Sequence, residues 1–102
     1  MTYGTALAAL ADPTRRRIFE RVLTAPQPVG AIADGLPVSR PAVSQHLKVL
    51  KKAGLIREHR QGTRRLYVAD PQALGELRTA IDAMWRDALA GMIASIDKEE
   101  SK

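Results

Sequence analysis

Residues 39–65 read SRPAVSQHLKVLKKAGLIREHRQGTRR, and this stretch decides both the fold and the chemistry of the chain. Eight of its residues are Lys or Arg and one, Glu58, is acidic, which gives +7, whereas the whole chain carries +5. The flanking segments are close to neutral (residues 1–38, +1) and acidic (residues 66–102, −3). Because phosphate neutralisation supplies most of the sequence-independent affinity for nucleic acid, this concentration of positive charge indicates a DNA-binding surface.

The first half of this stretch predicts a helix over residues 39–53. Ser39 is a favoured N-cap residue, and Pro41 suits the first turn of a helix. Gly54 is typical of the left-handed residue that ends a helix. One face of the helix is apolar and is expected to be buried; it consists of Val43, Leu47 and Leu50.

The second half of the stretch begins a β-hairpin that is expected within residues 55–69. Its strands are predicted at 55–60 and 65–69. They flank a turn at 61–64 in which Gly62 can adopt a positive φ. Such a hairpin directly after a helix is expected to form a wing beside it.

Four further helices are expected, at residues 5–11, 13–24, 29–36 and 72–96. Asp12-Pro13 and Asp70-Pro71 each supply an N-cap residue followed by a proline in the first turn. A turn of about four residues joins the third of these helices to the 39–53 helix, which is the arrangement of a helix-turn-helix. We therefore predict one mainly α-helical domain over residues 1–102 with a small β-hairpin, a winged helix-turn-helix.

The face of the 39–53 helix opposite its apolar stripe suits a major groove. Gln can pair with adenine, Arg can read guanine, Ser can donate or accept, and Lys can hold a phosphate. His46 lies at the edge of this face, so DNA contact and a boundary position satisfied by backbone both stay open. An ordinary solvated face is the alternative for the helix taken alone. The candidate DNA-binding residues here are Ser39, Arg40, Pro41, Ser44, Gln45, His46, Lys48 and Lys52.

Positive charge crowds around the turn of the hairpin, where repulsion is mildly unfavourable without an anion. Arginine at a hairpin tip can enter a minor groove beside a helix that lies in the major groove. The alternative is that Arg only keeps an edge strand soluble. The candidate DNA-binding residues of the hairpin are Arg57, Arg60, Thr63, Arg64 and Arg65.

Composition argues against several classes of function. Zero cysteines rule out disulfides and thiolate metal sites, and 4% aromatic residues are too few for a surface that stacks single-stranded bases. No apolar run approaches the roughly 20 residues that span a membrane, and the N-terminus lacks a signal pattern, so a cytoplasmic protein is expected. No motif pairs a nucleophile with a base, so we do not expect an enzyme.

Three motifs resemble those of the ArsR/SmtB family of bacterial winged-helix repressors: DPTRR at 12–16, PAVSQHLKVL at 41–50 and AGLI at 53–56. The resemblance extends over nearly the whole chain, and SRPAVSQHLK at 39–48 is its most specific part. It implies a DNA-reading helix at 39–52 and a wing at 57–65. It also implies a homodimer that represses a promoter, commonly its own, from a roughly palindromic operator.

Many members of that family sense metals, and the sequence departs from them here. Their thiolate pair would need Cys near residues 29–34, and the chain has none. The last helix has no His and offers only the separated Asp82, Asp87 and Asp97, which would make a poor transition-metal site. In having Trp85 in its last helix, the chain resembles a metal-independent branch of the family. We therefore expect no metal ligands and no cofactor.

The predicted last helix carries two apolar stripes. One can pack on the core of its own domain, and a partner helix is the natural cover for the other, because so small a monomer has little left to bury it. A single wide face folded back on the core is the alternative. The candidate dimer-interface residues are Leu7, Leu10, Leu77, Ile81, Met84, Trp85, Leu89 and Met92.

The sequence thus favours a dimeric regulator that binds a specific site on double-stranded DNA. One alternative is a winged-helix protein-interaction module whose basic face meets an acidic partner. Ser44 and Gln45 argue against it, since they are base-reading side chains rather than apolar anchors. A repressor released by a small hydrophobic effector, bound between the dimer helices, also stays open.

Overall fold

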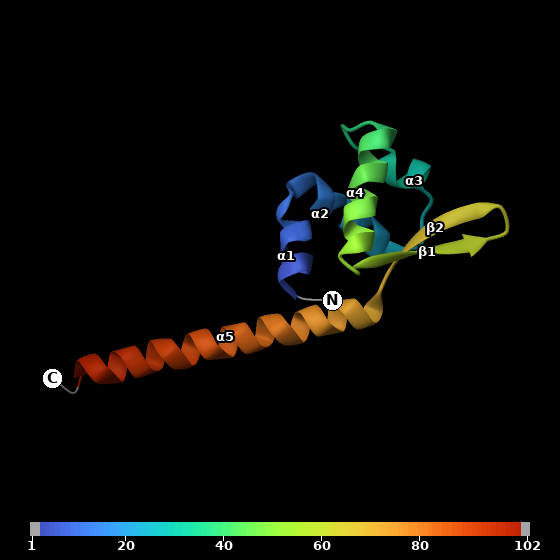
Figure 1. Cartoon of the computed structure of the whole chain (residues 1–102). Coiled ribbons are helices and arrows are strands. Elements are labelled where there is room, and N and C mark those ends of the chain that lie inside the picture. Colours follow the sequence, from blue (N-terminus) through green and yellow to red (C-terminus); the bar gives the residue numbers. More distant parts are fainter. Residues whose placement is uncertain (1–2, 101–102) are drawn as a thin grey trace.

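A computed structural model describes residues 3–100, and the side chains of residues 4–97. The ends of the domain expected over 1–102 lie outside these residues. The elements follow in the order α1 (Tyr3–Ala11), α2 (Pro13–Thr24), α3 (Val29–Ala33), α4 (Arg40–Lys52), β1 (Ile56–Gln61), β2 (Arg64–Ala69) and α5 (Pro71–Glu100). This is a winged helix-turn-helix, as predicted, with α3 and α4 as the helix pair and the β1–β2 hairpin as the wing (Figure 1).

The helix starts are capped by the residues that the sequence indicated. Asp12 Oδ1 accepts a hydrogen bond from the Arg15 backbone N–H at 2.9 Å, and Ser39 Oγ accepts one from Ala42 at 3.2 Å. Asp70 Oδ1 accepts from the backbone N–H groups of the first turn of α5 at 3.0 and 3.3 Å. Each cap satisfies donors that have no partner within the helix, so it fixes where the helix begins.

The core lies between α1, α2, α3, α4 and the first turns of α5. Its fully buried large side chains are Ile18, Val22, Ile32, Val43, Leu47, Leu50 and Leu55. Three of these come from α4, which packs on α2 and α3. The expected inward face of this helix is therefore confirmed.

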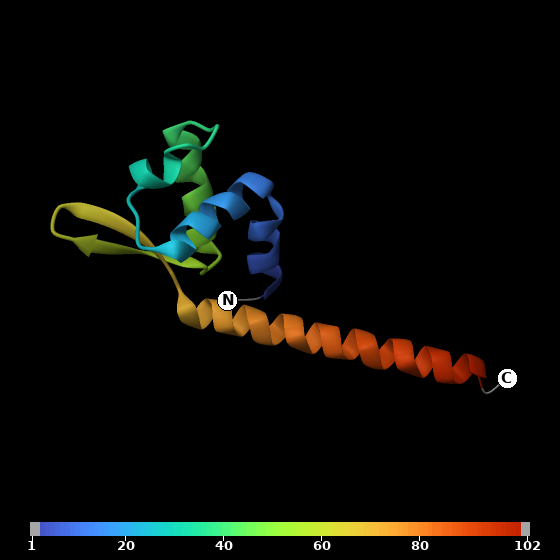
Figure 2. The ribbon, with the colours of Figure 1, turned by 180° about the vertical axis from the view of Figure 1, so that it is seen from behind.

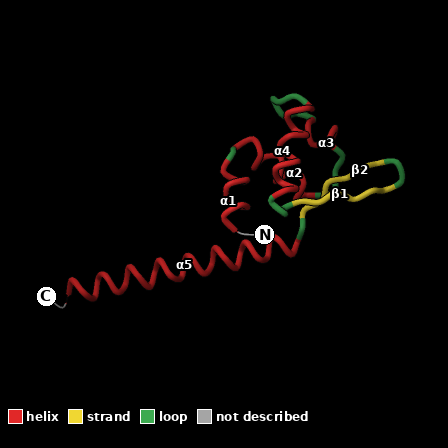
Figure 3. Tube along the Cα trace, in the orientation of Figure 1, coloured by secondary structure: helices red, strands yellow, loops and turns green. Residues whose placement is uncertain are grey.

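The wing is a two-stranded antiparallel hairpin in which Ile56 pairs with Ala69 and Gln61 pairs with Arg64. Its turn is tighter than expected, because Arg64 belongs to β2 and Gly62 has a φ of 65°. A second tie holds the base of the wing: Gln27 exchanges backbone hydrogen bonds with Tyr67 at 3.1 and 2.8 Å. The loop between α2 and α3 thus fixes the root of the hairpin, while its tip projects freely (Figure 3).

The last helix runs away from the domain, which corrects the expectation that a full apolar stripe packs on the core. Ala73 and Leu77 are buried and Leu74 is half-buried, but every residue from Ile81 to Asp97 is exposed. Figures 1 and 2 both show α5 extending away from the rest of the domain. The molecule measures 68 × 27 × 20 Å along its principal axes. A helix of 30 residues is about 45 Å long, which exceeds what this small core can cover.

Two further expectations are corrected. The third helix is shorter than the predicted 29–36, because α3 ends at Ala33 and Leu36 lies in the following turn, half-buried against the core. Leu77 lies inside the core of its own domain rather than on an exposed surface. Within residues 3–100, no helix is long and apolar enough to cross a membrane.

The packing of α4 gives a direct stability test. Leu47→Ala should lower the free energy of unfolding by about 2–5 kcal/mol, because it opens a cavity at a side chain that is 1% exposed. The matched control is Val49→Ala, on the same helix at 39% exposure, which should cost less than about 1 kcal/mol. Urea unfolding followed by circular dichroism, at one protein concentration, measures both. Equal losses would contradict this orientation of α4.

Candidate nucleic-acid interface

The polar side of α4 faces solvent directly opposite its buried side. Because Val43, Leu47 and Leu50 are buried, the residues about half a turn away must project outward. The exposed sequence candidates of this helix and its N-cap are Ser39, Arg40, Pro41, Ser44, Gln45, Lys48 and Lys52. The structure therefore brings together on one surface the hydroxyl, amide and cationic groups that could contact bases and phosphates.

Arg40 lies against α3 rather than standing free. A methyl group built onto Gly30 would collide with the Arg40 guanidinium, whose Cζ would lie 3.2 Å from it. The missing side chain at Gly30 thus leaves the space in which the guanidinium rests. Arg40 is thus held at the N-terminus of α4, beside the turn that joins α3 and α4.

His46 occupies the boundary of the helix and not its exposed centre. It is half-buried and lies close enough to Asp12, the N-cap of α2, to act on that carboxylate. The hydrogen bond from the Arg15 backbone N–H lowers the pKa of Asp12, and the nearby His46 lowers it further. This position sets His46 apart from Ser44 and Gln45, which are fully on the exposed side.

The five wing candidates are all exposed, but they do not share one face. In the antiparallel register Arg60 pairs with Arg65, and Gln61 pairs with Arg64. Side chains directly opposite each other lie on the same face, and neighbours along a strand alternate. Arg60 and Arg65 therefore lie on one face, and Arg57 and Arg64 on the other, with Thr63 in the turn.

One face of the wing is tied to the end of α4 by Glu58. This carboxylate lies 3.2 Å from Lys51 Nζ through Oε1 and 3.6 Å from Arg65 Nε through Oε2. The ion pairs connect α4, β1 and β2 across the basic surface. Sequence reasoning counted Glu58 but assigned it no role, although a single acid among eight basic residues was a usable signal.

Arginines of α2 donate hydrogen bonds to the ends of α1 and α3, and sequence reasoning did not predict these bonds. Arg21 donates to the backbone carbonyls of Ile32, at 3.2 Å, and of Asp34 at the end of α3. Arg15 and Arg16 donate to the carbonyls of Ala9 and Leu10, at 3.1 and 2.9 Å, at the end of α1. Cationic side chains at helix C-termini stabilise the unpaired carbonyls there. No local pattern could reveal these bonds, since they depend on how the helices pack.

The fold and this surface define a class, the winged helix-turn-helix DNA-binding proteins. Residues 10–59 match the family description "Helix-turn-helix domain". The chain is 55% identical over 94 residues to the HTH-type transcriptional regulator Rv2034 of Mycobacterium tuberculosis, covering 92% of this chain and 88% of that protein. That relative and this chain share nearly their full lengths.

Solved structures agree with this match. An ArsR-like transcriptional regulator from Rhodococcus sp. RHA1 superposes with a TM-score of 0.75 at 32% identity, covering 88% of each chain. The homodimeric winged helix-turn-helix DNA-binding domain Mb0332 from Mycobacterium bovis gives a TM-score of 0.65 at 26% identity, over 84% of this chain and 80% of that one. The chain belongs to the ArsR family of helix-turn-helix transcriptional regulators and is not an enzyme.

We predict that α4 reads bases and that the wing binds phosphates. Gln45→Ala should cost roughly 1–3 kcal/mol of binding free energy on an operator duplex and far less on random duplex, because it would remove the predicted base contact. Gln72→Ala, an exposed glutamine on α5, is the matched control and should leave both affinities unchanged. Fluorescence anisotropy across a salt series, on operator and scrambled duplexes, measures these differences.

The wing variant Arg64→Ala with Arg65→Ala should weaken binding to both duplexes. In a dimer, the salt slope should fall by about 1.8 for each phosphate that a subunit no longer binds. If Gln45→Ala weakens both duplexes equally, or the wing variant leaves the slope unchanged, this division of roles is wrong.

Proposed function

We propose that this regulator is a homodimeric repressor that binds a roughly palindromic operator through α4 and the wing of each protomer. The observation that carries the proposal is that the exposed face of α4 and the adjoining hairpin concentrate the positive charge of an otherwise near-neutral to acidic chain. Each α4 enters a major groove with Ser44 and Gln45 at the base edges, and Lys48 and Lys52 at phosphates. We propose repression rather than activation because the family that the sequence resembles consists of repressors.

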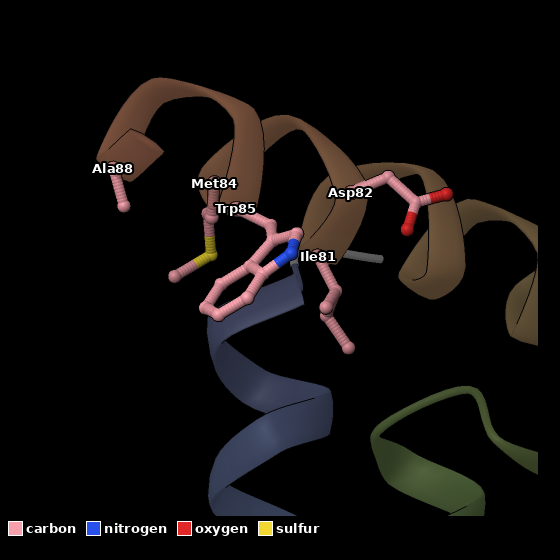
Figure 4. Close-up of a pocket in the computed structure, with 5 residues that line it drawn as sticks. All are labelled: Ile81, Asp82, Met84, Trp85 and Ala88. Atoms are coloured by element: carbon pink, nitrogen blue, oxygen red, sulfur yellow. The ribbon is translucent and has the colours of Figure 1, made fainter. Parts of the chain in front are cut away.

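The exposed apolar surface of α5 supports the dimer. Trp85 is 68% exposed and Met92 60%, and Ile81, Met84, Leu89, Ile93 and Ile96 are all between 43 and 59% exposed. Monomers rarely expose so many large apolar side chains together. Figure 4 shows Ile81, Met84 and Trp85 around a shallow hollow of α5, pointing toward the side where α1 lies, whereas Asp82 points away.

A second helix from a partner fits this surface better than folding back does, because α5 is already extended away from its own core. Leu7 on α1 is 37% exposed and can extend the interface, and Leu10 is half-buried beside it. Leu77 contributes to the core of its own protomer instead, so we leave it out of the proposed interface. A two-fold dimer places two α4 helices on half-sites about one DNA turn apart.

We also propose that metals do not control this repressor. The chain has no Cys, and among the side chains of residues 4–97 no three of His, Asp or Glu gather as they would around an ion. The helix from Pro71 to Glu100 contains no His. The donor set that transition metals prefer is therefore missing from the places where relatives of this family hold them.

The dimer is tested by Trp85→Ala combined with Leu89→Ala. The pair should shift the protein toward monomer and weaken operator binding at the same time, since the two half-sites would no longer be bound together. Asp87→Ala is the matched control, because position 87 lies on the opposite side of α5 from both residues. Analytical ultracentrifugation measures the mass. A wild-type protein that is monomeric at micromolar concentration would contradict the proposed dimer.

Metal independence is tested by adding zinc, cadmium, arsenite or a chelator to the operator-binding assay. Affinity should stay essentially unchanged, because no thiolate or imidazole cluster is available on α5 or near α3. A reproducible tenfold change with a stoichiometric metal, equal to about 1.4 kcal/mol, would contradict the proposal.

A further inference from the structure

Glu58 is the one acidic residue between positions 39 and 65, and it stands where the basic surface is densest. Its side chain is 29% exposed, against 51% for Lys51 and 56% for Arg65, so it is less exposed than either cation with which it pairs. The strand register places it opposite Tyr67, on the same face as Arg60 and Arg65. It therefore sits between the last turn of α4 and the wing.

Folding stability does not account for this arrangement. Ion pairs between exposed side chains contribute little to stability, because water and salt screen them. The root of the wing is already fixed by backbone hydrogen bonds, with Asp70 bonded to Leu55 at 3.0 Å and Gln27 bonded to Tyr67. The larger consequence of Glu58 is that one carboxylate pairs with two cations of the proposed DNA-binding surface, which offsets one of their two positive charges in the free protein.

We propose that Glu58 is a specificity-determining residue that withholds Lys51 and Arg65 from phosphates on random DNA. The inference rests on the proposed binding of operator by α4 and the wing. In a loose, sequence-independent complex the ion pairs with Glu58 persist. On the operator, α4 inserts fully into the major groove and brings phosphates close to Lys51 and Arg65. The phosphates then replace the Glu58 carboxylate as the partners of these two cations.

The physical reason is that binding to random DNA is almost wholly electrostatic, whereas operator binding also includes base contacts. A carboxylate beside two cations therefore removes a larger fraction of the binding free energy from the complex with random DNA than from the complex with operator. It lowers sequence-independent affinity and raises the ratio between operator and random binding, which is the quantity that matters among many competing sites.

The test is Glu58→Gln, which keeps the shape of the side chain and removes its charge. Affinity for a scrambled duplex should rise about tenfold and its salt slope should steepen by about 1.8 for each cation released per subunit of the dimer. Operator affinity should rise less than about threefold, so that the specificity ratio falls. Glu76→Gln, an exposed glutamate on α5, carries the same change in net charge and should leave the ratio as in wild type.

A double-mutant cycle with Lys51→Ala gives a second readout that does not depend on overall charge. On scrambled duplex, Lys51→Ala should cost less than about twofold in the wild-type background and more than about fivefold in the Glu58→Gln background. This difference is expected because Lys51 is free to reach phosphate only when Glu58 is neutral.

The outcomes are distinguishable. A wild-type protein that does not prefer operator over scrambled duplex contradicts the proposed function itself. If that preference is present but Glu58→Gln changes both affinities by the same factor, lowers operator affinity, or leaves the cost of Lys51→Ala unchanged, then the role assigned to Glu58 is wrong. Thermal unfolding by circular dichroism should show both glutamine variants folded like wild type.

Discussion

The rest of the structure depends on how the buried face of α4 is packed. Val43, Leu47 and Leu50 are each at most 1% exposed, wedged against α2 and α3. Because side chains leave a helix at fixed angles, burying these three fixes the direction of Ser44 and Gln45 on the other side. Ser39 caps the start of the helix, and Gly54, with a φ of 81°, follows the C-cap residue Ala53 and leads into the wing. The packing of one helix face thus positions both predicted DNA-binding elements.

The size of the domain imposes the second constraint. Four helices, the base of the hairpin and the first turns of α5 already close the core, so no described part of the chain covers the apolar residues of α5 from Ile81 onward. The surplus surface that supports the proposed dimer is therefore a consequence of the same small core that fixes α4. Assembly and DNA binding are coupled in this account, because two half-sites need two recognition helices held at a set spacing.

Local signals in the sequence predicted the elements well. The caps at Asp12, Ser39 and Asp70 and the glycine at position 54 placed the helix ends, and period-3.6 apolar spacing identified the buried face of α4. The outward course of α5 could not be predicted from its two stripes, because periodicity does not say how much core is available. The division of the wing arginines between two faces needed the strand register. The bonds of Arg21 and Glu58 needed the tertiary packing.

The central claim is that a dimer reads two half-sites through α4 while the wings contact the flanking backbone. Hydroxyl-radical footprinting of the DNA just upstream of the gene for this protein tests it most directly. The account predicts two protected half-sites with centres about one helical turn apart, related by a rough palindrome, and protection by the wing just beyond each. Protection of a single half-site at saturating protein, or uniform protection without discrete sites, would contradict it.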